Sequence, residues 1–242
     1  MRLQSKTILL TGATSGIGRN LVDRLPPSNR IIAVGRDGDR AATLRRLCPD
    51  LTFIACDLAV RADVNALAAN VLASSPIDGF IHCAAVQNTS HLTDPAFDLD
   101  ATYDEVSTNF TAFVHLTAML LPTLVAREET FVLAVNSGLG LVPKRSSAVY
   151  CATKGALDIF CQSLRAQLRD TPVAVMQAFL PLVDTPMTEG RGTGKLSPDD
   201  AAARIIDGIE RGVADHDIGK VKLLRALRRA SPSFARRIME QE

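Results

Sequence analysis

Six short, almost wholly apolar runs, separated by longer segments with helical periodicity, constrain the fold of this 242-residue chain more than any other feature. Continuously apolar strands suit a parallel sheet that is buried on both faces, whereas alternating strands expose one face. Right-handed helical connections between them give a doubly wound α/β fold. The predicted strands are 6–12, 30–35, 51–57, 78–84, 130–137 and 172–179, and the predicted helices between them are 16–25, 38–47, 61–74, 101–126 and 148–170.

A further helix is predicted near the end of the chain. Ser197 can cap it, Pro198 suits its first position, and acidic residues follow at 199 and 200, where the helix dipole favours negative charge. The sequence shows no internal repeat, linker or low-complexity tract. We therefore expect one domain that spans residues 1–242.

Polar or glycine-rich tips follow five of the predicted strands. Ligands of doubly wound sheets bind beyond the carboxyl ends of the strands, so these tips should line one crevice. They are residues 11–18, 35–37, 56–58, 82–88 and 136–138.

The first tip, TGATSGIG, follows a strand and opens a helix. Its glycines allow a tight turn and a close approach of the backbone to a pyrophosphate, which the helix N-terminus also attracts. Its T-G-x-x-x-G-x-G spacing differs from G-x-G-x-x-G. The turn predicts a dinucleotide site of the Rossmann type, with contacts from Gly12, Thr14, Ser15, Gly16, Ile17 and Gly18.

A second pattern joins a serine, a tyrosine and a lysine. Ser137 ends a predicted strand, Tyr150 follows thirteen residues later, and Lys154 follows four residues after that. Positions i and i+4 share one face of a helix, so Tyr150 and Lys154 should project together. A phenol has an ordinary pKa of about 10, and a nearby ammonium lowers it. The pattern predicts that Tyr150 exchanges a proton with a substrate oxygen that Ser137 hydrogen-bonds.

Together these motifs resemble the short-chain dehydrogenase/reductase family over nearly the whole chain. The resemblance rests on TGATSGIG, on CDL at 56–58, on Asn109 in the long fourth helix, and on Ser137 with YCATK at 150–154. It implies that Lys154 also anchors the nicotinamide ribose and that Asn109 holds Lys154 and a water. It further implies contacts with the adenine, the adenosine ribose, the nicotinamide amide and the phosphates from Asp57, Leu58, Ala84, Val183 and Thr185.

Two segments depart from the family's usual pattern. Where N-N-A-G usually follows the fourth strand, this chain has His82-Cys83-Ala84-Ala85. That motif mainly braces the sheet, so we expect a change in local packing rather than in chemistry. Where P-G-x-V-x-T usually follows the sixth strand, the chain has Leu-Pro-Leu-Val-Asp-Thr at 180–185. This difference should alter the shape of the cofactor site where the segment begins.

The end of the second strand bears on the choice of cofactor. An acidic residue there usually binds the ribose 2′-hydroxyl of NAD. This chain has Gly35, followed by Arg36, whose guanidinium can bind a 2′-phosphate in a bidentate manner. We expect NADP as the cofactor. The alternative is that Arg36 is solvated and Asp37 binds the ribose of NAD.

We expect an NADP-dependent oxidoreductase that interconverts a carbonyl and a secondary alcohol. A cofactor-binding regulator without turnover is the main alternative, but binding alone needs no phenol. An isomerase or an imine reductase could use the same residues. In each case the partner is a small molecule.

The substrate site should lie beside these residues, under flexible loops. Glycines at 190, 192 and 194 predict a mobile lid over residues 186–196. His91, Lys144 and Arg191 could recognise an acidic group of the substrate, or they are solvated loop charges. The expected rim comprises 86–92, 139–147 and 186–196.

Composition argues against several other classes. Lys and Arg total 27 and Asp and Glu total 26, so a net charge of +1 gives no sign of a nucleic-acid or anionic-membrane partner. The N-terminus lacks a secretory hydrophobic segment, and the longest apolar tract, 112–126, is too short to span a bilayer. The five cysteines lack metal-binding spacing, so we expect no metal and a cytoplasmic location.

The last segment, 220–242, is basic and amphipathic. It could lie on a membrane surface. A helix that packs on its own domain, with its arginines outward, is the preferred interpretation.

Two predicted helices carry more apolar and small residues than one buried face requires. We expect the excess to pair across a two-fold axis in a homodimer or homotetramer, or otherwise to pack under the C-terminal tail. The residues concerned are Ala112, Phe113, Leu116, Met119 and Leu120 in the first helix, and Ala152, Ala156, Ile159 and Phe160 in the second.

Overall fold

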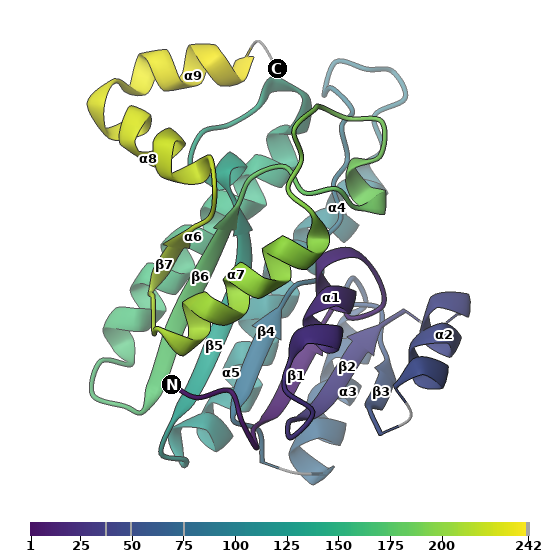
Figure 1. Cartoon of the computed structure of the whole chain (residues 1–242). Coiled ribbons are helices and arrows are strands. Elements are labelled where there is room, and N and C mark those ends of the chain that lie inside the picture. Colours follow the sequence, from purple (N-terminus) through teal and green to yellow (C-terminus); the bar gives the residue numbers. More distant parts are fainter. Residues whose placement is uncertain (37, 49, 75, 241–242) are drawn as a thin grey trace.

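A seven-stranded parallel sheet, with helices on both faces, organises residues 1–36, 38–48, 50–74 and 76–240, which the computed structural model describes (Figure 1). The strand order is β3-β2-β1-β4-β5-β6-β7, which confirms the doubly wound fold. The strands are β1 (Thr7–Thr11), β2 (Arg30–Gly35), β3 (Thr52–Ala55), β4 (Gly79–His82), β5 (Thr130–Ser137), β6 (Val173–Leu180) and β7 (Asp215–Asp217).

The two faces of the sheet explain why its strands are apolar throughout. In β1, Leu9 faces one core while Ile8 and Leu10 face the other, and all three side chains are fully buried. One core lies under α1 (Gly16–Arg24), α2 (Asp39–Leu47) and α7 (Pro198–Glu210). The other lies under α3 (Arg61–Ser74), α5 (Ala112–Val125) and α6 (Ala148–Gln167).

The predicted fourth helix is continuous but not uniform. It runs as α4 (Leu99–Val106), a π-helical turn (Ser107–Thr111) and α5. By length and composition alone the stretch Leu99–Val125 could cross a membrane. In this fold it covers the sheet, with Phe113, Leu116 and Leu120 fully buried.

The C-terminal part of the sheet differs from the prediction. The sequence did not indicate β7, a polar three-residue edge strand that pairs with β6. The helix after Ser197 is confirmed, because the Ser197 Oγ accepts a hydrogen bond from the Asp200 N–H at 3.0 Å.

The tail forms two helices rather than one, α8 (Val221–Ala230) and α9 (Pro232–Glu240). They lie at the end of the sheet near the loop of residues 186–196 (Figure 1). Pro232 begins the second helix. The Arg225 guanidinium donates to both carboxylate oxygens of Asp217, at 2.6 and 2.8 Å, and lies 4.5 Å from the centre of the Phe179 ring. Val221 and Ala235 are buried in a small core with Phe179. The tail is therefore fixed to β6 and β7.

Candidate active site

A cavity of about 1400 Å³ lies at the carboxyl ends of the strands. It brings together segments that are far apart in the sequence. The predicted site residues that line it are Gly12, Thr14, Ser15, Gly16, Ile17, Gly18, Arg36, Asp57, Leu58, Ala84, Ser137, Tyr150, Lys154, Val183 and Thr185. Among the described residues, no group of three His, Cys, Asp or Glu side chains could hold a metal ion.

The glycine-rich turn brings backbone atoms to the cavity without side chains in the way. Gly12 has a φ of 72°, in the left-handed region that favours glycine. A Cβ on Gly12 would lie 2.7 Å from the backbone nitrogen of Ala84, and one on Gly18 would collide with the carbonyl oxygen of Gly12. The turn can hold its shape only with glycine at both positions, and α1 then begins at the cavity. These features fit a bound pyrophosphate.

The end of β2 has no carboxylate and no room for one. A Cβ on Gly35 would lie 2.8 Å from the Cγ2 of Thr14. Arg36 is exposed and lines the cavity, and so does Arg40, in the first turn of α2. The sequence interpretation missed Arg40, although its position four residues after Arg36 could have indicated it. Asp37, the alternative ribose ligand, lies outside the described residues.

Ser137, Tyr150 and Lys154 all line the cavity, where the turn after β5 packs tightly on α6. A Cβ on Gly140 would lie 2.8 Å from the carbonyl oxygen of Lys154. The Ser137 Oγ accepts a hydrogen bond from the Leu139 N–H at 3.1 Å. The Lys154 Nζ lies 5.6 Å from the centre of the Tyr150 ring. The three residues, which are spaced along the sequence, therefore lie close together in the structure.

The expected effect of Lys154 on Tyr150 is not what the structure shows. Burial raises the pKa of the Tyr150 phenol above its usual value, and a hydrogen bond with Ser137 opposes this rise. The Lys154 ammonium points elsewhere, because it donates to the Val135 carbonyl oxygen at 2.8 Å. Burial lowers the pKa of Lys154 itself to about 8. The phenol is thus protonated at neutral pH in this arrangement.

The buried charge of Lys154 predicts an unusual pH dependence of stability. Its pKa falls from 10.5 to about 8 on folding. Between these pH values the unfolded chain holds a proton that the folded chain has lost, so stability rises with pH through this window. Below pH 8 the folded protein bears the full free-energy cost of burying the charged Lys154 ammonium. We expect Lys154→Met to stabilise the cofactor-free protein by about 1–2 kcal/mol at pH 7, with a smaller gain at pH 10.

Urea unfolding at both pH values measures this effect. Lys222→Met, at an exposed position of α8, is the matched control and should change the free energy of unfolding little at either pH. The same small change for Lys154→Met would show that folding does not bury the ammonium at a cost.

The direct hydrogen bonds of the Asn109 side chain go to Val86 and Thr153. It lies in the π-helical turn and is fully buried. Its Oδ1 accepts from the Val86 N–H at 2.8 Å, and its Nδ2 donates to the Val86 carbonyl at 2.8 Å and to the Thr153 hydroxyl at 3.2 Å. Asn109 therefore joins the loop after β4 to α6, one residue before Lys154.

His82 braces the sheet at the position where the N-N-A-G motif would place asparagines. Its Nε2 donates to the Thr108 carbonyl at 3.1 Å, and its Nδ1 accepts from the Thr11 hydroxyl at 3.0 Å. Burial lowers the pKa of His82 to about 3, so the ring is neutral. The Thr11 hydroxyl in turn accepts from the Ala84 N–H at 3.3 Å. One imidazole thus links β1, β4 and the π-helical turn.

Gln87 ties the three predicted rim loops together. Its side-chain oxygen accepts from Arg191 at 3.0 Å, and its Nε2 donates to the Ser147 hydroxyl at 3.0 Å. Arg191 is therefore engaged within the rim, while Lys144 lines the cavity. His91 is exposed and lies outside the cavity lining.

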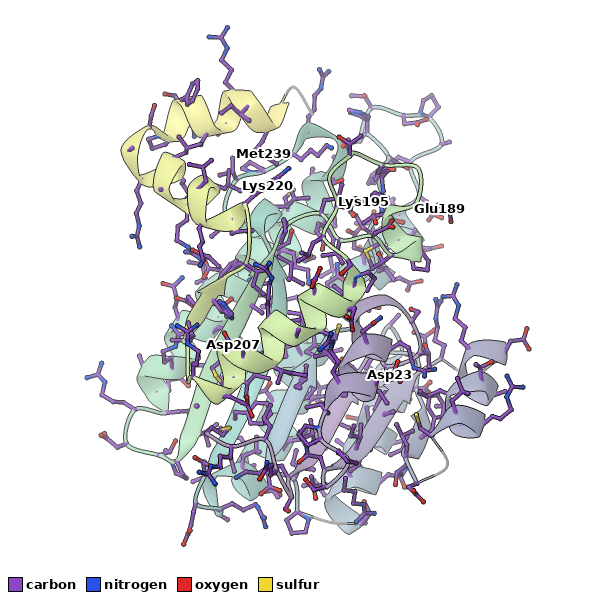
Figure 2. All side chains as sticks on the ribbon, in the orientation of Figure 1. Asp23, Glu189, Lys195, Asp207, Lys220 and Met239 are labelled. Carbon is purple, nitrogen blue, oxygen red and sulfur yellow. The ribbon has the colours of Figure 1, made fainter. Side chains whose placement is uncertain are left out.

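The tail helices also line the cavity, which the sequence interpretation did not predict. Lys220, Leu223, Leu224, Ile238 and Met239 all contribute. Figure 2 shows Lys220 and Met239 on the side of α8 and α9 that faces the loop bearing Lys195. The amphipathic pattern of residues 220–242 indicated that one helix face packs on the domain, but it did not indicate that this face borders the cavity.

Comparison with known proteins agrees with this geometry. The sequence model of the short chain dehydrogenase family matches residues 6–195. The chain is 33% identical over 238 residues to the uncharacterized oxidoreductase DltE of Bacillus subtilis, covering 95% of this chain and 94% of that protein. It is 30% identical over 217 residues to L-xylulose reductase of Bos taurus, covering 88% and 84%.

Solved structures share the whole fold. A short chain dehydrogenase from Burkholderia cenocepacia in complex with NADP has a TM-score of 0.88 at 20% identity, covering 99% of each chain. Solved neighbours hold either NADP or NAD, so the fold alone does not decide between the two cofactors. The chain belongs to the short-chain dehydrogenase/reductase family and is a nicotinamide-dependent oxidoreductase acting on CH–OH or C=O groups.

Proposed function

We propose that this enzyme interconverts a carbonyl and a secondary alcohol with NADP(H), and that Tyr150 is the proton donor and acceptor. The observation that carries the proposal is a single cavity lined both by the glycine-rich turn and by Ser137, Tyr150 and Lys154. A carbonyl compound in this cavity can approach the phenol and the cofactor together. A regulator that only binds a nucleotide would not need this cluster.

The cofactor supplies or accepts the hydride, and the protein supplies proton transfer and position. Because burial keeps the Tyr150 phenol protonated, it is ready to donate a proton to the oxygen of a carbonyl that is being reduced. Ser137 donates a hydrogen bond to the same oxygen and stabilises its developing charge. In the oxidative direction Tyr150 must first lose its proton. Lys154 would favour that loss if its ammonium turned from the Val135 carbonyl toward the phenol.

A panel of ketones and aldehydes, assayed with NADPH and NADH in parallel, tests the proposal. We expect turnover of at least one class of carbonyl, with NADPH preferred. Cofactor binding without turnover of any member would instead support the regulator.

We attribute the preference for NADPH to Arg36 and Arg40, which line the cavity beyond Gly35. We expect Arg36→Ala to weaken NADPH binding by about 1.5–3 kcal/mol, the scale of a charge-assisted contact, and to change NADH binding little. Fluorescence titration with each cofactor measures both dissociation constants. Arg46→Ala, at an exposed position of α2 outside the cavity lining, should bind both cofactors as the wild type does. Equal losses for NADPH and NADH in Arg36→Ala would exclude a contact with the 2′-phosphate.

We also propose that the enzyme self-associates through α4 and α6, although not through all the residues first expected. Ala112, Phe113, Leu116 and Leu120 are buried in the chain's own core. The large apolar side chains that remain exposed on these helices include Tyr103 at 71% and Ile159 at 67%. The tail packs on Phe179 rather than over these helices. Light scattering should therefore give a mass above that of the 26.0 kDa chain, and a monomer would contradict the proposal.

A further inference from the structure

The cavity has two chemically different ends. At the cofactor end, backbone and polar side chains of the glycine-rich turn and of α2 line it. Large apolar side chains from two places, the segment after β6 and the tail, also line the cavity. They are Leu182, Met187, Leu223, Leu224, Ile238 and Met239.

Several of these apolar side chains are only partly covered by the protein itself. Leu223 is 63% exposed, Leu182 is 38% exposed and Ile238 is 36% exposed. Single exposed apolar residues are ordinary, but these three share one cavity with Tyr150. Apolar surface gathered in a concave site is typical of a ligand pocket.

The apolar wall is held in place by contacts behind it. Arg225, on α8, forms a part-buried bidentate pair with Asp217 and stacks on Phe179. Val221 and Ala235 are 2% and 0% exposed and pack on the same small core. Because the wall is preformed, a bound apolar group need not order the tail helices in order to be covered.

Some of the polar groups that line the same cavity are already engaged with one another. Arg191 and the side chain of Gln87 bind each other across the rim. Lys220 lines the cavity at the start of α8 (Figure 2).

We propose that the substrate is a ketone or aldehyde, or the corresponding alcohol, that carries an extended apolar chain. Its carbonyl lies at Tyr150, and its chain lies against Leu223 and Ile238 under the tail. This substrate class rests on the proposed carbonyl–alcohol activity.

A series of unbranched methyl ketones of increasing chain length, assayed with NADPH, tests the substrate class. We expect kcat/KM to rise about two- to fourfold for each added methylene until the chain outgrows the wall, mainly through KM. Turnover without any dependence on chain length would overturn this substrate class while leaving the carbonyl–alcohol activity intact. Failure to reduce any member, or any other carbonyl, would overturn the activity itself.

Two variants test where the apolar chain of the substrate binds. We expect the double variant Leu223→Ser with Ile238→Ser to flatten the dependence of kcat/KM on the length of the ketone. The control is Phe234→Ser, because Phe234 is 52% exposed on α9 but does not line the cavity. It should retain the full dependence. Thermal unfolding of both variants checks that the tail remains folded, and an unchanged dependence in a folded double variant would overturn this binding mode.

Discussion

Tyr150→Phe is expected to lower kcat by about 10²–10⁴-fold while folding and NADPH binding stay close to normal. The change removes one hydroxyl and retains the ring, which is only 9% exposed and fills its place in the core. The lost hydroxyl belongs to a side chain that lines the cavity together with Ser137. Steady-state kinetics, thermal unfolding and cofactor titration separate these effects.

The sequence offers a matched control, because it contains only two tyrosines. Tyr103 lies on α4 and is 71% exposed, away from the cavity lining. Tyr103→Phe should leave kcat unchanged. Near-full activity of Tyr150→Phe would remove Tyr150 from the mechanism, whatever the behaviour of the control.

The central strands could be predicted because burial on both faces leaves a clear pattern. Ile8, Leu9 and Leu10 are consecutive, apolar and fully buried, as is typical of a parallel strand that is covered on both faces. The edge strand β7 leaves no such pattern. Its sequence, Asp-His-Asp, is polar and half exposed, and its pairing with β6 depends on the neighbouring strand rather than on its own residues.

That Tyr150 and Lys154 lie together could be predicted for a similar reason. The four-residue spacing of Tyr150 and Lys154 determines that they share a helix face, whatever surrounds them. The hydrogen-bond partners of these side chains could not be predicted, because they are backbone groups that lie far away in the sequence. The Lys154 ammonium binds the Val135 carbonyl of β5, and Asn109 binds the Val86 backbone. The sequence indicated that Lys154 and an oxidised nicotinamide lower the pKa of Tyr150. In this cofactor-free structure burial raises it instead, and burial is a property of the whole fold.

A buried polar network behind the site links the strand that bears Ser137 to the helix that bears Tyr150. Gln177 on β6 is fully buried. Its Oε1 accepts from the Asn136 Nδ2 at 2.8 Å, and its Nε2 donates to the carboxylates of Asp158 and Asp215 at 3.1 Å each. Asn136 in turn accepts from the Ser137 N–H at 2.8 Å. The donors and acceptors of the Gln177 amide are thus all used.

Gln177→Leu is expected to destabilise the enzyme by about 2–4 kcal/mol, since it leaves the buried Asn136 amide without its acceptor and takes a donor from two carboxylates. Urea unfolding measures the loss. Gln162→Leu is the matched control, because Gln162 is exposed and donates to the same Asp158 oxygen at 2.8 Å. It should cost less than about 0.5 kcal/mol. Equal losses would mean that the Asp158 contact, rather than burial of the whole amide, determines the effect. A larger loss of unfolding free energy for Gln177→Leu, together with a fall in kcat, would show that this network positions Ser137 and Tyr150 relative to each other.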